Sequence, residues 1–317
     1  MDYLLLFLGI SLLVIGGEFL VRSSVSISLK LNISKMIVGL TVVSFATSVP
    51  ELFVSIVAAI EGKPDFAIGN VVGSNIANIG LVLGVTAIIH KLSTDRDFNR
   101  FYWPIMMLFS IFLYYFLSTE QILSAFEGLM LLVGLVLYLL FLVIRTRTKK
   151  DIIVEDVDVS LKSTSYFKVL IWLALGILGL YYGSEWLVSG ATGIALDFGV
   201  SDRIISLTMV ALGTSIPELA ASVMAAIKKE KDLSLGNLIG SNIFNIGSVL
   251  GITALLHPLA LESPKMLSSD LIWMLAFAFI LMPLALLIPQ RFYINRLKGF
   301  ILLIGYMVFI FMAFFKS

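Results

Sequence analysis

The 317-residue sequence has no cysteine, only two histidines and few charges, with Asp, Glu, Lys and Arg together at 14%. A chain without cysteine forms neither disulfides nor thiolate metal sites. The scarcity of charge is matched by a hydrophobic content of 59% and a mean hydropathy of +1.02, which exclude a soluble domain of this length. The net charge of +1 says little by itself, and neither a nucleic-acid partner nor an obligate protein partner is expected.

Long apolar segments recur along the chain, each near the roughly 20 residues that cross the hydrocarbon core of a bilayer. A transmembrane β-barrel would instead show weaker, alternating segments of about ten residues. The sequence therefore predicts an all-α polytopic membrane protein with ten transmembrane helices, surrounded by lipid. The predicted spans are 3–29, 35–61, 66–90, 100–118, 122–145, 166–196, 202–227, 233–256, 268–288 and 297–315.

Lysine and arginine are distributed unevenly among the connections between these spans. If the polar segment 146–165 faces the cytoplasm, ten alternating spans leave both termini outside. Positive residues near the cytoplasmic side then outnumber those near the outer side by about four to one, in line with the positive-inside rule. The outer side keeps Lys63, Arg203, Lys265 and Lys316. We therefore expect a protein of the cell membrane (plasma or inner), with both termini outside.

The sequence also contains an internal repeat. "TVVSFATSVPELFVSIVAAI" at 41–60 returns as "TMVALGTSIPELAASVMAAI" at 208–227, and "GNVVGSNIANIG" at 69–80 returns as "GNLIGSNIFNIG" at 236–247. The offset is constant, since 214 − 47 = 167 and 245 − 78 = 167. Each half holds five spans, an odd number, so the second copy must enter the membrane upside down. Inverted repeats of this kind are typical of secondary transporters with a site near the membrane midplane.

This symmetry predicts a division of the chain into a first five-helix repeat, a cytoplasmic linker and a second, inverted five-helix repeat. The three parts cover residues 1–145, 146–165 and 166–317.

A proline followed by a glutamate lies within a predicted span of each repeat, at Pro50–Glu51 and Pro217–Glu218. Proline frees backbone carbonyls of the preceding turn, and an ionisable residue at mid-membrane is unfavourable by about 2.5–3.5 kcal/mol even on gentle scales. Two glutamates at equivalent positions could meet across the pseudo-two-fold axis, where cations would neutralise them. Two alternatives stay open: a kink satisfied by nearby hydroxyls, and a pair of protonated glutamates bonded to backbone.

The neighbouring residues supply further oxygen ligands. Hydroxyls precede each glutamate, and in the third and eighth spans a serine and an asparagine four residues apart share a helix face. Carboxylate, hydroxyl and carbonyl oxygens suit Ca²⁺ or Na⁺ rather than zinc or copper. Glycines at 69, 73 and 80 and their mates at 236, 240 and 247 are expected to let helices approach closely. Asn75 and Asn242 lie off the polar face, and we expect interhelical hydrogen bonds from them.

The motifs "ATSVPELFVS", "GTSIPELAAS", "GSNIANIG" and "GSNIFNIG" resemble the two α-repeats of the sodium/calcium exchanger family of cation/calcium antiporters, in a minimal prokaryotic form. The resemblance implies exchange of Na⁺ for Ca²⁺ by alternating access, with three Na⁺ usually coupled to one Ca²⁺ and hence electrogenic. It implies calcium transport and calcium homeostasis rather than enzymatic activity, with no cofactor besides the transported ions. The implied ion ligands are Glu51, Glu218, Thr47, Thr214, Ser48, Ser215, Ser74, Ser241, Asn78 and Asn245, with main-chain oxygens near Ser44 and Ala211.

Two departures from the family pattern are visible. Ala46 stands where the family usually has glycine, and Asn245 stands where several relatives, including potassium-dependent ones, carry aspartate. The second departure weakens a potassium-coupled interpretation without removing it. Coupling to H⁺ or K⁺ therefore stays open as an alternative, as does a cation channel in which the paired carboxylates form a filter. A membrane enzyme finds little support, since no nucleophile or metal-binding histidine accompanies the glutamates.

Overall fold

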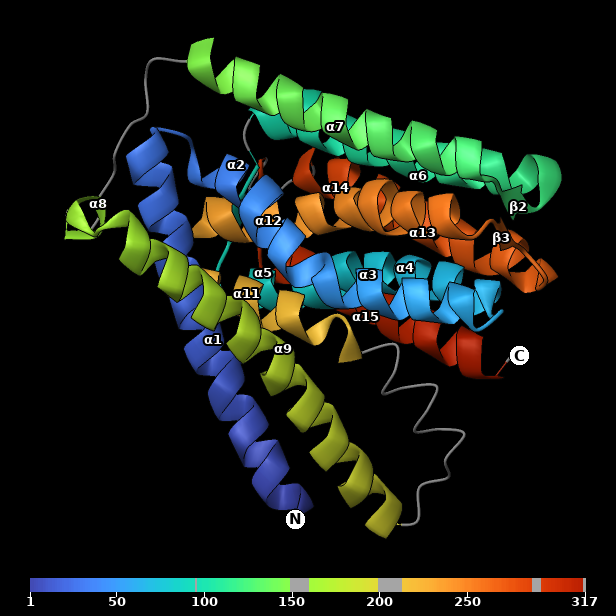
Figure 1. Ribbon diagram of the computed structural model, residues 1–317, viewed down its shortest axis with the longest axis horizontal. Coiled ribbons are helices and arrows are strands. Elements are labelled where there is room, and N and C mark those ends of the chain that lie inside the picture. The colour runs from blue at the N-terminus through green and yellow to red at the C-terminus, as the bar shows by residue number, and fades with distance from the viewer. Residues whose placement is uncertain (95, 149–159, 199–212, 287–291, 316–317) are drawn as a thin grey trace.

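The computed structural model describes residues 1–94, 96–148, 160–198, 213–286 and 292–315, and these residues are almost entirely helical (Figure 1). The α-helices of the first half are α1 (Asp2–Leu31), α2 (Lys35–Val38), α3 (Ser44–Ile60), α4 (Pro64–Ala77), α5 (Gly84–Ile89), α6 (Trp103–Glu120) and α7 (Ala125–Thr148). Those of the second half are α8 (Ser160–Ser163), α9 (Tyr166–Asp197), α11 (Ile216–Ile227), α12 (Lys231–Phe244), α13 (Gly251–Leu256), α14 (Leu271–Leu286) and α15 (Arg296–Phe315). Five π-helical segments are η1 (Gly39–Val43), η2 (Asn78–Leu83), η3 (Phe98–Tyr102), η4 (Asn245–Leu250) and η5 (Met266–Asp270).

The described residues contain nine helices that are long and apolar enough to cross a membrane. They match nine of the predicted spans, with ends that differ by a few residues; the span predicted at 100–118, for example, runs over Phe98–Glu120. The remaining predicted span, 202–227, is described only in its second part, where α11 covers Ile216–Ile227. The predicted ligand position Ala211 falls outside the described residues.

Two short antiparallel strand pairs show that the two repeats are inverted relative to each other. Strand β1 (Leu92–Ser93) pairs with β4 (Tyr293–Ile294), and β2 (Ile122–Leu123) pairs with β3 (Leu259–Ala260). At the offset of 167 residues β1 corresponds to β3, yet these two strands lie in different sheets, each paired with a strand of the other repeat. Connections that correspond in sequence therefore lie at opposite ends of the bundle, as an inverted repeat requires.

The structure treats the two prolines differently. In the second repeat a turn at Thr214–Ser215 precedes α11, and Pro217 lies in the first turn of that helix, where its missing N–H is tolerated. In the first repeat α3 runs through Pro50 without interruption. A π-helical turn, η1, directly precedes α3, and the Ser44 hydroxyl donates to the Gly39 carbonyl at 2.7 Å. The widened turn and this hydroxyl bond lie before the Ala46 carbonyl, the one whose helical donor Pro50 lacks.

Helices α1 and α9 lie side by side and run obliquely across one face of the bundle (Figure 1). Glycines bring their backbones into contact: a Cβ added at Gly16 would lie 2.7 Å from the Leu180 nitrogen, and one at Gly176 would lie 2.8 Å from the Leu20 nitrogen. Helix α12 lies at the centre, and the span that it begins is the most buried of the nine. The structure therefore consists of an oblique helix pair against a packed bundle that contains both repeated glutamate motifs.

Candidate functional site

The two repeated glutamates lie inside the bundle. Glu51 is on α3, Glu218 is on the first turn of α11, and both are 0% exposed. Helices α3 and α11 pack against each other, so the two glutamates come from adjacent segments of the two repeats, and their approach across the repeat interface stays a prediction. Neither carboxyl oxygen of either residue has a hydrogen-bond partner among the described residues. Two buried, unpaired carboxyl groups are strongly unfavourable unless protons or cations neutralise them.

Further polar atoms without partners belong to the same repeated motifs as the glutamates, and they come in repeat mates. The hydroxyls of Ser48 and Ser215 are buried and unpaired, and so are both side-chain polar atoms of Asn78 and the Oδ1 atom of Asn245. Few buried polar atoms of native proteins lack a partner, and each exception needs an explanation. These exceptions are predicted ion ligands from both halves of the chain, all of them at least 96% buried, whereas the unpaired hydroxyls of Ser24, Ser26, Thr94 and Tyr138 lie outside the repeated motifs.

The predicted threonine and serine ligands connect the two repeats. The Ser74 hydroxyl of the first repeat lies 3.2 Å from the Thr214 hydroxyl of the second. In the mate arrangement, the Thr47 hydroxyl lies 3.3 Å from the Ser241 hydroxyl. Each proline–glutamate helix is thus joined to the serine–asparagine helix of the other repeat, and both halves of the chain are needed to form one site.

Ser44 is expected to contribute through its main chain, and its side chain lies between two main-chain oxygens. Its single hydroxyl proton is shared between the main-chain oxygens of Gly39 at 2.7 Å and of Asn237 at 2.9 Å. Its main-chain oxygen lies 3.4 Å from the Thr47 hydroxyl, at the edge of the region occupied by the unpaired oxygens. The hydroxyl therefore joins η1 to α12, and the contribution expected of Ser44 to ion binding is that of its main-chain oxygen.

Two asparagines that sequence reasoning did not single out also lie at the site. Asn70 contacts Thr214 and Ser55, and its mate Asn237 contacts Thr47 and Ser222. Both asparagines open the repeated "GNxxGSN" segments, and their recurrence at the constant offset was the signal that could have found them.

The expectation for Asn75 and Asn242 is half right. Asn75 donates across the repeat interface to the main-chain oxygen of Asn242 at 3.3 Å, whereas Asn242 donates within its own helix to Leu238. Asn75 also accepts a hydrogen bond from the amide nitrogen of Asn245 at 3.1 Å. A main-chain oxygen can only accept, so the amide nitrogen of Asn75 must face Asn242 and its oxygen must face Asn245. This contact turns the unpaired Oδ1 of Asn245 towards the site.

The donor set gathered here consists of carboxylate, hydroxyl and amide oxygens. Among the described residues no group of three or more His, Cys, Asp or Glu side chains could hold a metal ion. Hard cations such as Ca²⁺ and Na⁺ bind such oxygens, with neutral ligands completing the shell around a few carboxylates. The arrangement therefore fits a hard cation, with two carboxylates to balance its charge.

Comparison with known proteins agrees with this geometry. Residues 1–146 and 168–315 match the family described as sodium/calcium exchanger protein. The chain belongs to the sodium/calcium exchanger family. It is 39% identical to CaxA, a proposed antiporter of Alkalimonas amylolytica, over 96% of both chains, and 31% identical to the sodium/calcium exchanger MaX1 of Methanosarcina acetivorans over 99% of both. A solved structure of the sodium-calcium exchanger NCX_Mj superposes with a TM-score of 0.82 at 32% identity, over 97% of both chains.

Family membership settles the class of activity. An exchanger of this family is a transporter and not an enzyme, and Na⁺ and Ca²⁺ are its substrates rather than resident cofactors. The ten-helix inverted repeat is the fold of this exchanger family, and the helices of the described residues match it.

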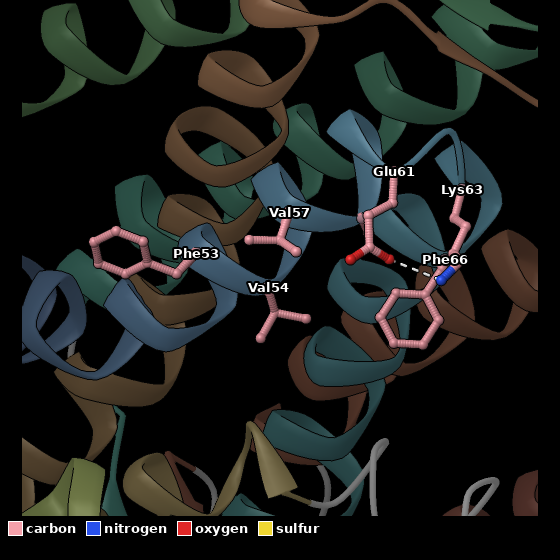
Figure 2. A pocket seen from close by; sticks show the side chains of 7 residues that line it. Phe53, Val54, Val57, Glu61, Lys63 and Phe66 are labelled. Carbon is pink, nitrogen blue, oxygen red and sulfur yellow. Dashed lines mark hydrogen bonds and ion pairs between the residues drawn. The ribbon is translucent and has the colours of Figure 1, made fainter.

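A separate hollow lies against α3 and α4 and does not belong to this exchanger site (Figure 2). Its lining is mostly apolar and includes Phe53, Val57 and Phe66, and an ion pair of 2.7 Å joins Glu61 and Lys63 at its edge. None of the unpaired site oxygens lines it. The hollow therefore offers a mostly apolar surface, and the Glu61 carboxylate that lines it is paired with Lys63.

Proposed function

We propose that this chain exchanges Na⁺ for Ca²⁺ at the buried site between its two repeats, by alternating access. Glu51 and Glu218 neutralise the bound cations, and the same oxygens hold Ca²⁺ at one time and Na⁺ at another. The neutral ligands of the proposed site are Thr47, Thr214, Ser48, Ser215, Ser74, Ser241, Asn78 and Asn245, together with main-chain oxygens near Ser44 and Ala211.

One observation carries this proposal: buried polar atoms without partners recur as mates around two buried glutamates. Isolated protonated glutamates would account for the carboxyl groups alone. They would not account for unpaired serine hydroxyls and asparagine oxygens at matching positions of both repeats. A shared cation satisfies all of these oxygens at once, and its charge offsets that of the carboxylates.

The same proposal includes an orientation and a division of the chain. Residues 1–145 form one repeat, 166–317 form the other, and the linker 146–165 lies in the cytoplasm with both termini outside. The positive-inside distribution of lysine and arginine supports this orientation in the cell (plasma or inner) membrane. Transport then needs no obligate protein partner, because one chain supplies both halves of the site.

The decisive experiment is calcium uptake by proteoliposomes that contain the purified protein and are loaded with Na⁺, K⁺ or acid in turn. We expect uptake to follow an outward Na⁺ gradient. Uptake driven by K⁺ or by acid instead would favour the alternative coupling ions. Uptake that follows the calcium gradient alone, with no counter-ion, would favour a channel.

Substitution of either glutamate tests the site. Glu51→Gln and Glu218→Gln each remove half of the negative charge of the proposed site, so sodium-driven calcium flux should fall at least a hundredfold, about 3 kcal/mol. Glu61→Gln is the matched control, because Glu61 lies outside the site and pairs only with Lys63 in an exposed contact. Near-normal flux in both site variants would contradict the assignment.

A further inference from the structure

We propose that Asn70 and Asn237 are positioning residues, each of which orients the hydroxyl of an ion-binding threonine in the opposite repeat. Asn70 acts on Thr214, and Asn237 acts on Thr47. This inference rests on the proposed function of the site and adds two residues to it.

The contacts of Asn70 join two helices and both repeats. Its amide nitrogen donates to the Ser55 hydroxyl at 3.1 Å and lies 3.4 Å from the main-chain oxygen of Glu51, both on α3. Its Oδ1 accepts from the Thr214 hydroxyl at 3.3 Å. Asn70 therefore connects α4 to the glutamate helix of its own repeat and to the threonine of the other repeat.

Asn237 repeats this arrangement in the second half of the chain. Its amide nitrogen donates to the Ser222 hydroxyl on α11 at 3.0 Å, and its Oδ1 accepts from the Thr47 hydroxyl at 3.3 Å. Asn237 is 1% exposed, and Ser222 is fully buried. The same three-residue contact thus forms twice, in inverted copies whose sequences differ at about half of the compared positions.

The direction of these hydrogen bonds follows from their partners. The main-chain oxygen of Glu51 can only accept, and the Ser55 hydroxyl is 3.5 Å from the main-chain oxygen of Ala67, to which it donates. The amide nitrogen of Asn70 must therefore face α3, and its oxygen must face Thr214. A hydroxyl has one proton and two lone pairs, so a threonine that donates to asparagine accepts from the neighbouring serine hydroxyl and keeps its other lone pair for a cation.

An amide is suited to this role because it is neutral. A carboxylate at position 70 or 237 could accept the threonine proton equally well, but it would add negative charge beside the two glutamates. An alanine would remove this acceptor, and the threonine proton would then point to another neighbour, such as the serine hydroxyl, or towards the cation. The asparagines therefore fix ligand geometry without changing the charge balance of the site.

Double-mutant cycles test the inference. Calcium affinity of the purified protein is measured by isothermal titration calorimetry for Asn70→Ala, Thr214→Val and the double variant, and likewise for Asn237→Ala and Thr47→Val. Each single change should weaken calcium binding about five- to tenfold, the usual range for one hydrogen bond. Each matching double variant should bind within about twofold of its threonine variant alone, because the asparagine acts through that threonine.

The crossed pairs are the control. Asn70→Ala with Thr47→Val, and Asn237→Ala with Thr214→Val, should multiply their single effects, since these residues do not contact each other. A merely structural asparagine would lower the thermal midpoint yet give equal, multiplicative effects in matching and crossed pairs, which would overturn the proposal. If Asn70→Ala or Asn237→Ala does not fold, Ser55→Ala or Ser222→Ala is used instead, because each removes the hydroxyl that accepts from the asparagine amide. The matching and crossed pairs must then differ in the same way. A parent protein that binds no calcium would instead contradict the proposed function, so the two failures are distinguishable.

Discussion

At the scale of single residues, position 245 shows how one contact determines what a ligand can be. The amide nitrogen of Asn245 donates to Oδ1 of Asn75, whose own nitrogen is held by the main-chain oxygen of Asn242. Asn245 must therefore supply a proton to Asn75 while it turns an oxygen towards the site. Several members of the sodium/calcium exchanger family carry an aspartate at this position. Its carboxylate oxygen would lie against the Asn75 oxygen, and two acceptors repel each other unless the aspartate carries a proton.

We predict that Asn245→Asp makes calcium binding more sensitive to acid. The new aspartate adds a third negative group and faces the Asn75 oxygen, so in the absence of calcium it holds a proton that calcium must displace. Calcium affinity of the variant should fall more steeply than that of the parent between about pH 8 and pH 6, by up to tenfold per pH unit for one displaced proton. Calcium titrations of both proteins at several pH values measure this slope.

Asn78→Asp is the control for the charge itself. Asn78 is the repeat mate of Asn245, but neither of its side-chain polar atoms has a partner among the described residues. The same charge there meets no opposing amide oxygen, and its acid sensitivity should be weaker. Identical pH dependence in parent and Asn245→Asp would place Asn245 outside the ion-binding shell.

At the scale of elements, the site depends on how closely α12 approaches the segment before α3. A Cβ added at Gly236 would lie 3.1 Å from the Cα of Gly39, and one at Gly240 would collide with the Ser44 hydroxyl and lie 2.8 Å from the Cα of Leu40. The expectation that these glycines permit close packing is therefore confirmed. For Gly73, in contrast, no described atom lies within 4 Å of an added Cβ.

We predict that Gly240→Ala lowers both stability and exchange. Its Cβ must displace Ser44 or shift the backbone of η1, and overpacking of this kind typically destabilises a protein by about 1–3 kcal/mol. Calcium flux should fall by more than the loss of folded protein explains. A shift of Ser44 also displaces Thr47, because the Thr47 hydroxyl contacts the main-chain oxygen of Ser44. Thermal unfolding in detergent and sodium-driven calcium flux provide the two measurements.

Gly134→Ala on α7 is the matched control, because the nearest described atom to its added Cβ is a Phe109 ring carbon at 3.5 Å, an ordinary contact. Equal effects of the two substitutions would mean that the approach of α12 to η1 is not what the site requires.

At the scale of the whole molecule, the number of Na⁺ exchanged for each Ca²⁺ determines the calcium gradient that exchange can sustain. Three Na⁺ exchanged for one Ca²⁺ would move one net charge across the membrane. A tenfold sodium gradient provides about 1.4 kcal/mol per ion, and one charge across 100 mV adds about 2.3 kcal/mol. The total of roughly 6.5 kcal/mol sustains a calcium ratio above about 10⁴, whereas two Na⁺ without net charge sustain only about 10².

We therefore predict electrogenic exchange. Calcium uptake by proteoliposomes with a fixed sodium gradient should change several-fold when a potassium gradient and valinomycin set the voltage. Proteoliposomes that contain the Glu51→Gln variant, which should not exchange, measure the calcium leak. Flux that is unaffected by voltage would rule out the three-for-one stoichiometry and leave an electroneutral exchange.

The sequence by itself determined the architecture and the candidate ligands. The length of the apolar segments gave the spans, and an odd number of spans per repeat gave the inversion. Two glutamates at a constant offset indicated the candidate site. Each of these inferences follows from local composition and from the period of the repeat. Only the tertiary structure decided that α3 continues through Pro50, that Asn75 turns Asn245, and that Asn70 and Asn237 hold threonines of the opposite repeat. These contacts join residues 140 or more positions apart, such as Ser74 with Thr214. They exist only once the two repeats are docked, and no local pattern specifies which side chains then meet.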